Sequence, residues 1–295
     1  MTVALDELER LLKRYVSTGA AVVVVLLGSG QAASPDPGAP ADTGQATTMT
    51  VRPGPPGGRA EAGGATPEPR RTADDATTAA AVHGWGTPTR VEEFDGGTEQ
   101  WQLYDGPGHG GKGRRAPGAV SVRDGVLTIT GDPSGTTGGM SWGEGRRYGR
   151  WEARVRAPAA DPSYNAVMLL WPDEEDWPAG GEIDFMEMGD AARRTTDAFV
   201  HYGEDNRQVH GSVRTDATRW HNWAVEWSPS SITTYLDGRE WYRTTDTAVQ
   251  PPGAMHLCIQ LDWFPEGGTV RESTMQVDRV REYAVHAGAA RAGGG

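Results

Sequence analysis

The chain has 295 residues, including 41 glycines, 20 prolines and a single cysteine. One cysteine excludes an intrachain disulfide and a cysteine-rich zinc site. The formal net charge of −12 repels phosphate backbones and anionic lipids, so the composition argues against a nucleic-acid-binding or membrane-surface protein and favours neutral or cationic ligands.

Residues 1–28 carry most features of an export signal. Arg10, Lys13 and Arg14 precede the apolar stretch 16–27, which has the length of a signal-peptide core and is too short for an ordinary transmembrane helix. Small residues then offer a cleavage site, although the acidic residues before the stretch are atypical of a signal peptide. We predict a signal peptide or an N-terminal membrane anchor, and therefore a secreted protein. An amphipathic helix is the alternative, because leucines recur at helical spacing.

Residues 29–84 have the composition of a disordered linker. No aromatic residue occurs between Tyr15 and Trp85, and proline, glycine, alanine and threonine dominate. Such a segment cannot bury enough apolar surface to offset its chain entropy. We therefore predict one folded domain over residues 85–286, which contains all 11 tryptophans, followed by a flexible tail over residues 287–295.

The folded domain shows the two-residue period of β-strands. In residues 120–129, polar and apolar residues alternate around an Asp124-Gly125 turn, which is typical of a hairpin. The alternation recurs in residues 150–157, 221–228, 231–245 and 275–283. Many short antiparallel strands over about 200 residues predict an all-β domain, either a β-sandwich or a jelly roll.

Three acidic residues lie close together in an otherwise apolar strand, within residues 177–189 (WPAGGEIDFMEMG). Strict alternation places Glu182 and Asp184 on one face and Glu187 on the other. A one-residue bulge at Phe185-Met186 returns Glu187 to the first face, and bulges re-aim side chains beside active sites. We therefore predict a row of three carboxylates.

A row of carboxylates suits glycoside hydrolysis with retention. One carboxylate attacks the anomeric carbon, and a second donates a proton to the leaving oxygen from about 5–5.5 Å away. Asp184, between the outer two, can hydrogen-bond the nucleophile and raise the pKa of a neighbouring acid by its like charge. Because a concave face brings the outer side chains together, this chemistry predicts a cleft. Clustered carboxylates also hold calcium, but the apolar neighbours offer no further side-chain oxygen.

The segment GEIDFME (residues 181–187) resembles the Glu-x-Asp-x-x-Glu signature of glycoside hydrolase family 16, the laminarinase and lichenase family. Four further segments resemble strands of that family in the same order, namely residues 148–158, 164–172, 221–238 and 275–283. The resemblance covers residues 90–283 and implies a concanavalin-like β-sandwich jelly roll of two bent antiparallel sheets with a concave substrate cleft. It also implies Glu182 as nucleophile, Asp184 as its helper and Glu187 as acid/base, with no cofactor required for catalysis.

Several residues are candidates for substrate contacts, since sugars stack their C–H faces on aromatic rings. Trp171 and Trp177 lie nearest the acids in sequence. His201, Gln260 and Trp263 fall where the resemblance implies cleft residues, although a single histidine is usually a satisfied polar residue. The remaining candidates are Asn165, which could bind a sugar hydroxyl or form a turn, and Trp142 with Arg147, which could line the far end of the cleft. Core packing is predicted for the other tryptophans: Trp85, Trp101, Trp151, Trp220, Trp223, Trp227 and Trp241.

Two further expectations concern a metal and the thiol. The resemblance implies a structural calcium on the opposite sheet, held by Asp278 with Glu92 and Glu93. Cys258 lies in an apolar run, which predicts a buried and unreactive thiol.

Together these patterns predict a secreted, retaining endo-acting hydrolase of a β-1,3 or mixed β-1,3/1,4-glucan. We expect a monomer whose partner is the polysaccharide, with no nucleic-acid or protein partner. The alternatives are a glucan-binding lectin, which would typically have lost a catalytic glutamate, a transglycosylase, and a hydrolase of a galactan or a bacterial exopolysaccharide. Residues 259–264 (IQLDWF) differ from the Leu-Asn segment and Gly-Gly pair common in relatives that cut laminarin, which leaves the substrate open.

Overall fold

The computed structural model describes residues 75–285. The predicted signal peptide or anchor (1–28), most of the linker and the tail (287–295) lie outside the described residues, so those assignments stay predictions. Within residues 75–285, no helix has both the length and the apolar character needed to cross a membrane.

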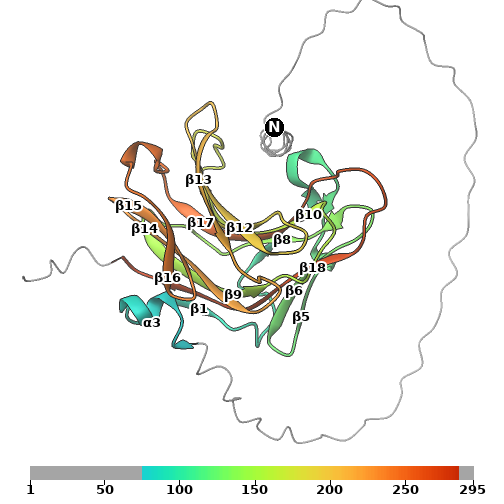
Figure 1. Cartoon of the computed structure of the whole chain (residues 1–295), viewed down its shortest axis with the longest axis horizontal. Helices are drawn as coiled ribbons and strands as arrows, with labels where there is room; N and C mark the ends of the chain where they lie inside the picture. Colours follow the sequence, from blue (N-terminus) through green and yellow to red (C-terminus); the bar gives the residue numbers. More distant parts are fainter. Residues whose placement is uncertain (1–74, 286–295) are drawn as a thin grey trace, which may run out of the picture. The chain divides into compact units, whose positions relative to one another are not determined.

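Two antiparallel sheets form two layers, which confirms the predicted all-β sandwich (Figure 1). We call the seven-stranded sheet the front sheet. Its strand order is β13 (Arg207–Arg214), β12 (Thr195–Tyr202), β11 (Glu182–Met188), β10 (Tyr164–Pro172), β17 (Met255–Trp263), β8 (Gly139–Ser141) and β2 (Gln102–Leu103).

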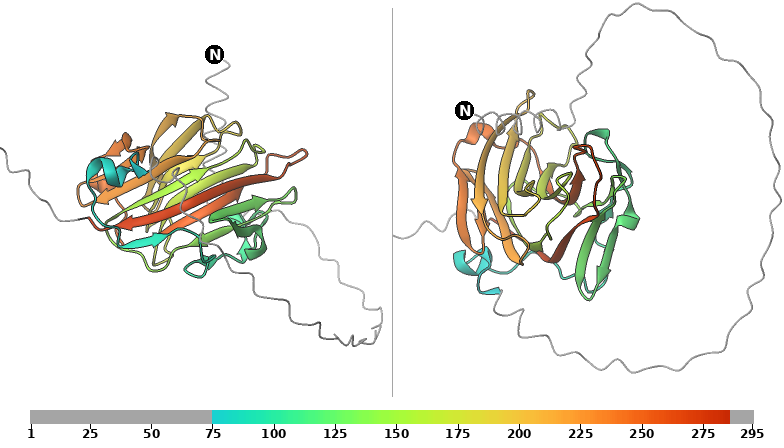
Figure 2. Two further views of the ribbon diagram at one scale, coloured as in Figure 1. Left: turned by 90° about the horizontal axis from the view of Figure 1, so that it is seen from below. Right: turned by 45° about the vertical axis from the view of Figure 1, so that its right-hand side comes forward.

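We call the eight-stranded sheet the back sheet. Its order is β16 (Arg239–Thr244), β15 (Ser231–Leu236), β14 (His221–Ser228), β9 (Gly149–Arg156), β18 (Ser273–Tyr283), β6 (Val126–Gly131) and β5 (Val120–Arg123), with β1 (Arg90–Glu92) paired to β18. A small third sheet contains β3 (Gly106–Pro107), β4 (Arg114–Arg115) and β7 (Thr136–Thr137). Figure 2 shows that the strands of both large sheets are twisted and bent.

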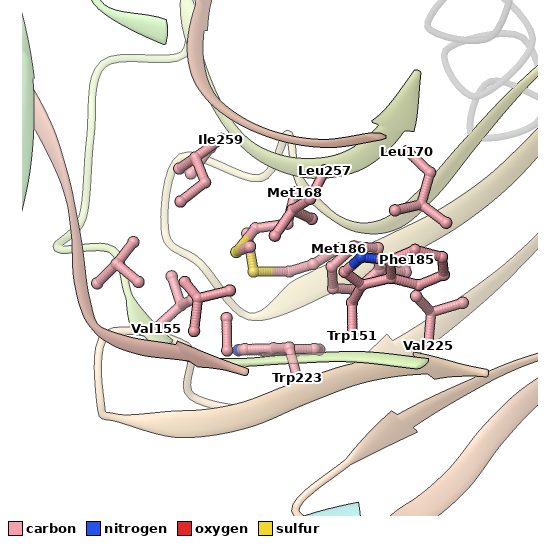
Figure 3. Packing of buried hydrophobic residues seen from close by; sticks show 14 of the residues in the cluster. Trp151, Val155, Met168, Leu170, Phe185, Met186, Trp223, Val225, Leu257 and Ile259 are labelled. Atoms are coloured by element: carbon pink, nitrogen blue, oxygen red, sulfur yellow. The ribbon is translucent and has the colours of Figure 1, made fainter. Parts of the chain in front are cut away.

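The main core fills the space between the two large sheets (Figure 3). Trp151 and Trp223 from the back sheet are fully buried against Met168, Phe185 and other apolar side chains of the front sheet. Truncating such a buried tryptophan costs about 3–5 kcal/mol. Core packing is confirmed for Trp85, Trp101, Trp151, Trp223 and Trp227, and half-buried Trp241 also packs against the main core. Trp220 is half-buried with the guanidinium groups of Arg154 and Arg156 over its ring.

Strand β10 explains why part of the sequence lacks the two-residue alternation. Met168 and Leu170 face the core, whereas Val167 and Leu169, which alternate with them, line a cavity on the opposite face and are also buried. A strand covered on both faces reads as a continuous apolar run. The central position of β10 in the front sheet therefore accounts for its composition.

The folded domain begins before Trp85, which corrects the predicted linker boundary. Helix α3 (Ala79–His83) starts at the N-cap Thr78, whose hydroxyl accepts the Ala81 backbone N–H. Contacts with the back sheet hold it: Glu152 of β9 accepts the Ala79 N–H at 2.5 Å, and Trp85, which follows the helix, packs edge-on against Tyr235 and Tyr283. A helix this short depends on such tertiary contacts, which its local sequence does not reveal.

Three 3₁₀ helices complete the described elements. They are η1 (His109–Gly111), η2 (Pro117–Ala119) and η3 (Thr247–Val249). Only η1 borders the cavity described next, because His109 and Gly110 belong to its lining.

Candidate active site

A cavity of about 530 Å³ lies over the outer face of the front sheet, the face turned away from the core. Its floor comes from β12, β11, β10 and β17, and the segment 102–110 forms one wall. All three acids of the predicted row, Glu182, Asp184 and Glu187, line it. The concave face that the chemistry required is therefore present.

The predicted bulge in β11 is confirmed. Asp184 pairs with Phe199 and Glu187 pairs with Asp197, so β11 advances by one residue more than β12 between these pairs. Phe185 and Met186 are both fully buried in the core. The extra residue returns Glu187 to the face that carries Glu182 and Asp184, as a bulge must.

Glu182 is almost completely buried, with 7% of its surface exposed. The Trp177 indole Nε1 donates a hydrogen bond to Glu182 Oε2 at 3.0 Å. Burial first, and then the charge and hydrogen bond of Asp184, raise the pKa of Glu182 well above its ordinary value, while the charge of His201 opposes the shift. A second carboxyl nearby disfavours the ionised form of a buried acid, whereas a nearby cation favours it.

His201 on β12 supplies that cation. Its Nε2 lies 3.2 Å from Asp184 Oδ2, and its Nδ1 lies 2.8 Å from Asn206 Oδ1. Burial lowers the pKa of His201, but the hydrogen bond to Asp184 and the charge of Glu182 outweigh that effect and raise it to about 9. At neutral pH the imidazolium therefore donates through both nitrogens and offsets one negative charge of the row.

Glu187 is the most accessible of the three acids and is half-buried at the cavity surface. Asn165 on β10 donates from Nδ2 to Glu187 Oε1 at 2.7 Å. The sequence suggested a sugar hydroxyl or a turn as the purpose of Asn165. The structure instead joins its amide to a carboxylate of the row.

Two tryptophans form an aromatic wall beside Glu182. The rings of Trp171 and Trp177 stack at an interplanar angle of 12° with centroids 6.2 Å apart, and both line the cavity. Trp171 Nε1 also donates to Glu175 Oε2 at 2.8 Å, which fixes the ring. Such a wall offers flat apolar surface of the kind on which sugar rings stack.

The opposite part of the cavity contains a charged network that the sequence did not reveal. Arg115 of β4 donates to Gln260 Oε1 and, at 2.6 Å, to Asp262 Oδ1 on β17, and His109 Nδ1 lies 3.5 Å from Asp262 Oδ2. Although burial acts to raise the pKa of Asp262, Arg115 and His109 bring it far below its ordinary range. Gln260 was a candidate contact, whereas Arg115 and His109 lie in a glycine-rich stretch that carries no signal.

Besides Asn165, which lies beside the cavity, three further candidate contacts do not line it. Trp142 belongs to the core, where it is 1% exposed and stacks on Trp101 at 5.1 Å, so the prediction for it is wrong. Arg147 is exposed, with its guanidinium over the ring of Tyr148. The Trp263 ring instead covers Gly135, leaving no room there for a Cβ atom. In each case the side chain contacts a residue that does not line the cavity.

The residues expected to hold calcium do not fit that ion. Asp278 contacts the guanidinium groups of Arg154 and Arg279. Glu92 accepts the Phe94 backbone N–H and the Trp101 indole N–H, and Glu93 pairs with Arg281. Calcium requires six to eight oxygen ligands. Here cationic and N–H donors already occupy these carboxylates.

Within the described part of the chain, one cluster of side chains has the arrangement needed to hold a metal ion. Ligand atoms of Glu182, Asp184 and His201 all lie within 4.8 Å of one another. An ion bound there would engage two of the three carboxylates in the row. It would also compete with the His201 imidazolium for Asp184.

Cys258, also near this cavity, is fully buried, as the sequence predicted. Burial raises the pKa of its thiol to about 12, and the Tyr104 hydroxyl donates to its sulfur at 3.1 Å. The thiol is thus protonated at neutral pH, as expected for an unreactive cysteine.

Known proteins resemble this chain in sequence. The β-glucanase of Rhodothermus marinus is 33% identical over 176 residues, which cover 50% of this chain and 60% of that protein. The endo-1,3-1,4-β-glycanase EglC of Rhizobium meliloti (strain 1021) is 29% identical over 226 residues, covering 69% of this chain and 47% of that protein. The chain thus spans about half the length of the curated relatives that it matches.

Solved structures resemble the fold. The LamAcat structure from Zobellia galactanivorans superposes with a TM-score of 0.60 at 20% identity, covering 68% of this chain and 99% of that one. An endo-β-1,3-glucanase from Pyrococcus furiosus gives 0.59 at 22% identity, covering 68% and 95%. The family described as "Glycosyl hydrolases family 16" matches residues 114–279, a span that includes the acid row and most of both sheets. The chain therefore belongs to family 16 of the glycosyl hydrolases.

Proposed function

We propose that the protein is a retaining, endo-acting glycoside hydrolase that cleaves internal β-linkages of a polysaccharide, namely a β-1,3 or mixed β-1,3/1,4-glucan. The observation that carries this proposal is the row Glu182, Asp184 and Glu187 on the cavity floor, in which each acid has a different partner. Different environments for neighbouring carboxyls assign them different roles in catalysis.

In the first step, a Glu182 oxygen attacks the anomeric carbon and the bond to the leaving oxygen breaks. Glu187 gives its proton to that oxygen, which leaves as a hydroxyl of the departing chain. The product is a glycosyl ester of Glu182 and an ionised Glu187. Glu187 suits this task because it is half-buried at the cavity surface, where a glycosidic oxygen can reach it.

In the second step, water attacks the ester at the anomeric carbon. Glu187 now removes a proton from this water, and Glu182 leaves as a carboxylate. Both steps invert the anomeric centre, so the configuration is retained overall. The enzyme returns to its starting state with Glu187 protonated.

The positive charge of His201 favours the ionised form of the nucleophile. Glu182 must lose its proton before it attacks, although its surroundings raise its pKa. The His201 imidazolium, 3.2 Å from Asp184, acts in the opposite direction and stabilises the anionic cluster. The Trp177 N–H bond to Glu182 also favours the ionised carboxylate.

Support for a glucan comes from the relatives and from the cavity walls. The named relatives are a β-glucanase and an endo-1,3-1,4-β-glycanase. Stacked Trp171 and Trp177 offer apolar surface for a neutral sugar, and the excess of acids in the chain disfavours a heavily sulfated glycan. We would expect a lectin to have lost a catalytic glutamate, and this chain retains all three acids.

The test is release of reducing sugar by the full chain from laminarin, lichenan, agarose, carrageenan, xyloglucan and succinoglycan. Glu182→Gln is the inactive comparison, and Glu204→Gln is a matched control because Glu204 is exposed on the turn between β12 and β13. We expect release from laminarin or lichenan that Glu204→Gln keeps and Glu182→Gln loses. Binding of a glycan without release by the folded protein would contradict the proposal and support a lectin. Transfer to sugar acceptors in preference to water would indicate a transglycosylase.

A further inference from the structure

Asn165 lies beside the cavity but does not line it. Only 7% of its surface is exposed, and its described polar contact is the 2.7 Å hydrogen bond from Nδ2 to Glu187 Oε1. A substrate in the cavity therefore reaches Glu187 before it reaches Asn165. A residue that binds a sugar hydroxyl would be expected to line the cavity itself.

Asn165 also lies between two acids. It pairs across the strands with Asp262 of β17, while its amide extends toward Glu187 of β11. Asp262 is an ionised group, since Arg115 lies 2.6 Å from it and brings its pKa below the ordinary range. The neutral Asn165 adds no negative charge beside Glu187. An acidic residue at this position would add one and would repel the Glu187 carboxylate.

We propose that Asn165 is a positioning residue for the acid/base Glu187, and that its amide N–H holds Oε1 so that Oε2 carries the catalytic proton. This inference rests on the proposed function. Proton transfer requires heavy atoms about 2.6–3.2 Å apart, so rotation of the carboxyl group impairs it. An N–H that donates to a carboxylate also favours its ionised form.

The test uses three variants of the full chain. Asn165→Leu has a similar volume and no donor, and Asn165→Asp has the same shape but adds a charge. The matched control is Asn222→Leu on β14 of the back sheet, where Asn222 is 3% exposed and outside the cavity. Kinetics are measured on the glycan that the wild-type protein cleaves and on an aryl glycoside of the same sugar with an activated leaving group.

For Asn165→Leu we expect kcat on the glycan to fall about tenfold, with KM within about twofold of the wild-type value, because only part of the roughly 10²–10⁴-fold contribution of a general acid is lost. The activated glycoside needs little protonation, so its glycosylation rate stays within about twofold. The basic limb of the pH–rate profile moves to higher pH in Asn165→Leu and further in Asn165→Asp. Asn222→Leu lowers the melting temperature and leaves the shape of the profile unchanged.

A ¹³C titration of the Glu187 carboxyl, assigned with Glu187→Gln, gives a measurement that does not depend on activity. We expect its midpoint to be higher in Asn165→Leu than in the wild-type protein. An unchanged midpoint overturns the inference, and so does a raised KM with an unchanged kcat, which would indicate a sugar contact. Failure of the wild-type protein to cleave any glycan would instead contradict the proposed function. The titration would still show whether Asn165 acts on the Glu187 carboxyl, so the two failures are distinguishable.

Discussion

Glu152 on the back sheet and Glu182 on the front sheet are both almost completely buried glutamates, at 3% and 7% exposure. Burial raises the pKa of both, to about 7 for Glu152. Glu152 accepts backbone N–H groups from Ala79 and Ala80 of α3, so both of its oxygens are hydrogen-bonded within the fold. Glu182 faces a second carboxyl, an indole N–H and an open cavity.

Burial and a raised pKa therefore do not by themselves identify a catalytic acid. Across the outer face of the back sheet, acids are paired with arginines, as in Arg150 with Glu226 and Arg154 with Asp278. Among the acids of the row, Asp184 has His201 as its cationic neighbour, and the other two receive neutral N–H donors. Ionisable groups that crowd one another in a cavity are the stronger functional signal.

The largest expected effect separates the two glutamates directly. Glu182→Gln removes the nucleophile, so we expect kcat on the glycan to fall at least about 10³-fold with little change in stability. Glu152→Gln keeps one acceptor for the α3 N–H groups, so kcat should stay within about twofold while the free energy of unfolding falls by about 1 kcal/mol. Initial rates and thermal unfolding measure both. An active Glu182→Gln variant would refute the assignment of the nucleophile.

The second prediction separates the two outer acids of the row. Glu187→Ala should lose about 10²–10⁴-fold on the glycan, because protonation of the leaving oxygen is lost. An aryl glycoside with a good leaving group should restore much of its glycosylation rate, whereas the same substrate should not rescue Glu182→Ala. Pre-steady-state release of the aryl alcohol measures this step. Rescue of Glu182→Ala in place of Glu187→Ala would exchange the two roles.

The third prediction concerns the indole of Trp177, which combines two functions. Trp177→Phe keeps an aromatic face but loses the N–H that donates to Glu182 Oε2, so kcat should fall about tenfold at an unchanged KM. Trp177→Ala should lower kcat and also raise KM, because the stacked wall with Trp171 is lost. Steady-state kinetics on the same glycan distinguish them. Equal KM values in both variants would mean that the ring does not bind sugar.

Local patterns in the sequence predicted the parts of this molecule that depend on the period of a strand. The two-sheet fold and the bulge between Asp184 and Glu187 follow from alternation and its one interruption. The burial of Cys258 follows from its apolar neighbours. These features need only residues that are close together in the chain.

Features that depend on contacts distant in sequence were missed or misassigned. Trp142 packs on Trp101 in the core, and Arg115 reaches Asp262 from another sheet. Helix α3 exists because Glu152 supplies acceptors from a strand more than 70 residues away. Nothing near these residues indicates their partners. Two of the expected calcium ligands, Asp278 and Glu93, likewise contact arginines from distant parts of the chain, namely Arg154 and Arg281.

The smallest expected effect tests the structural side of the comparison through pH. Because the pKa of Glu152 is raised from 4.5 to about 7 in the folded protein, its protonated form favours folding. The stability it contributes is therefore present below about pH 4.5 and is lost as the pH rises through about 7. We expect the melting temperature of the wild-type protein to fall over this interval by more than that of Glu152→Gln. The corresponding difference in the free energy of unfolding is about 1–3 kcal/mol. Parallel pH dependences would mean that Glu152 stays ionised at its α3 contacts, which would contradict its raised pKa.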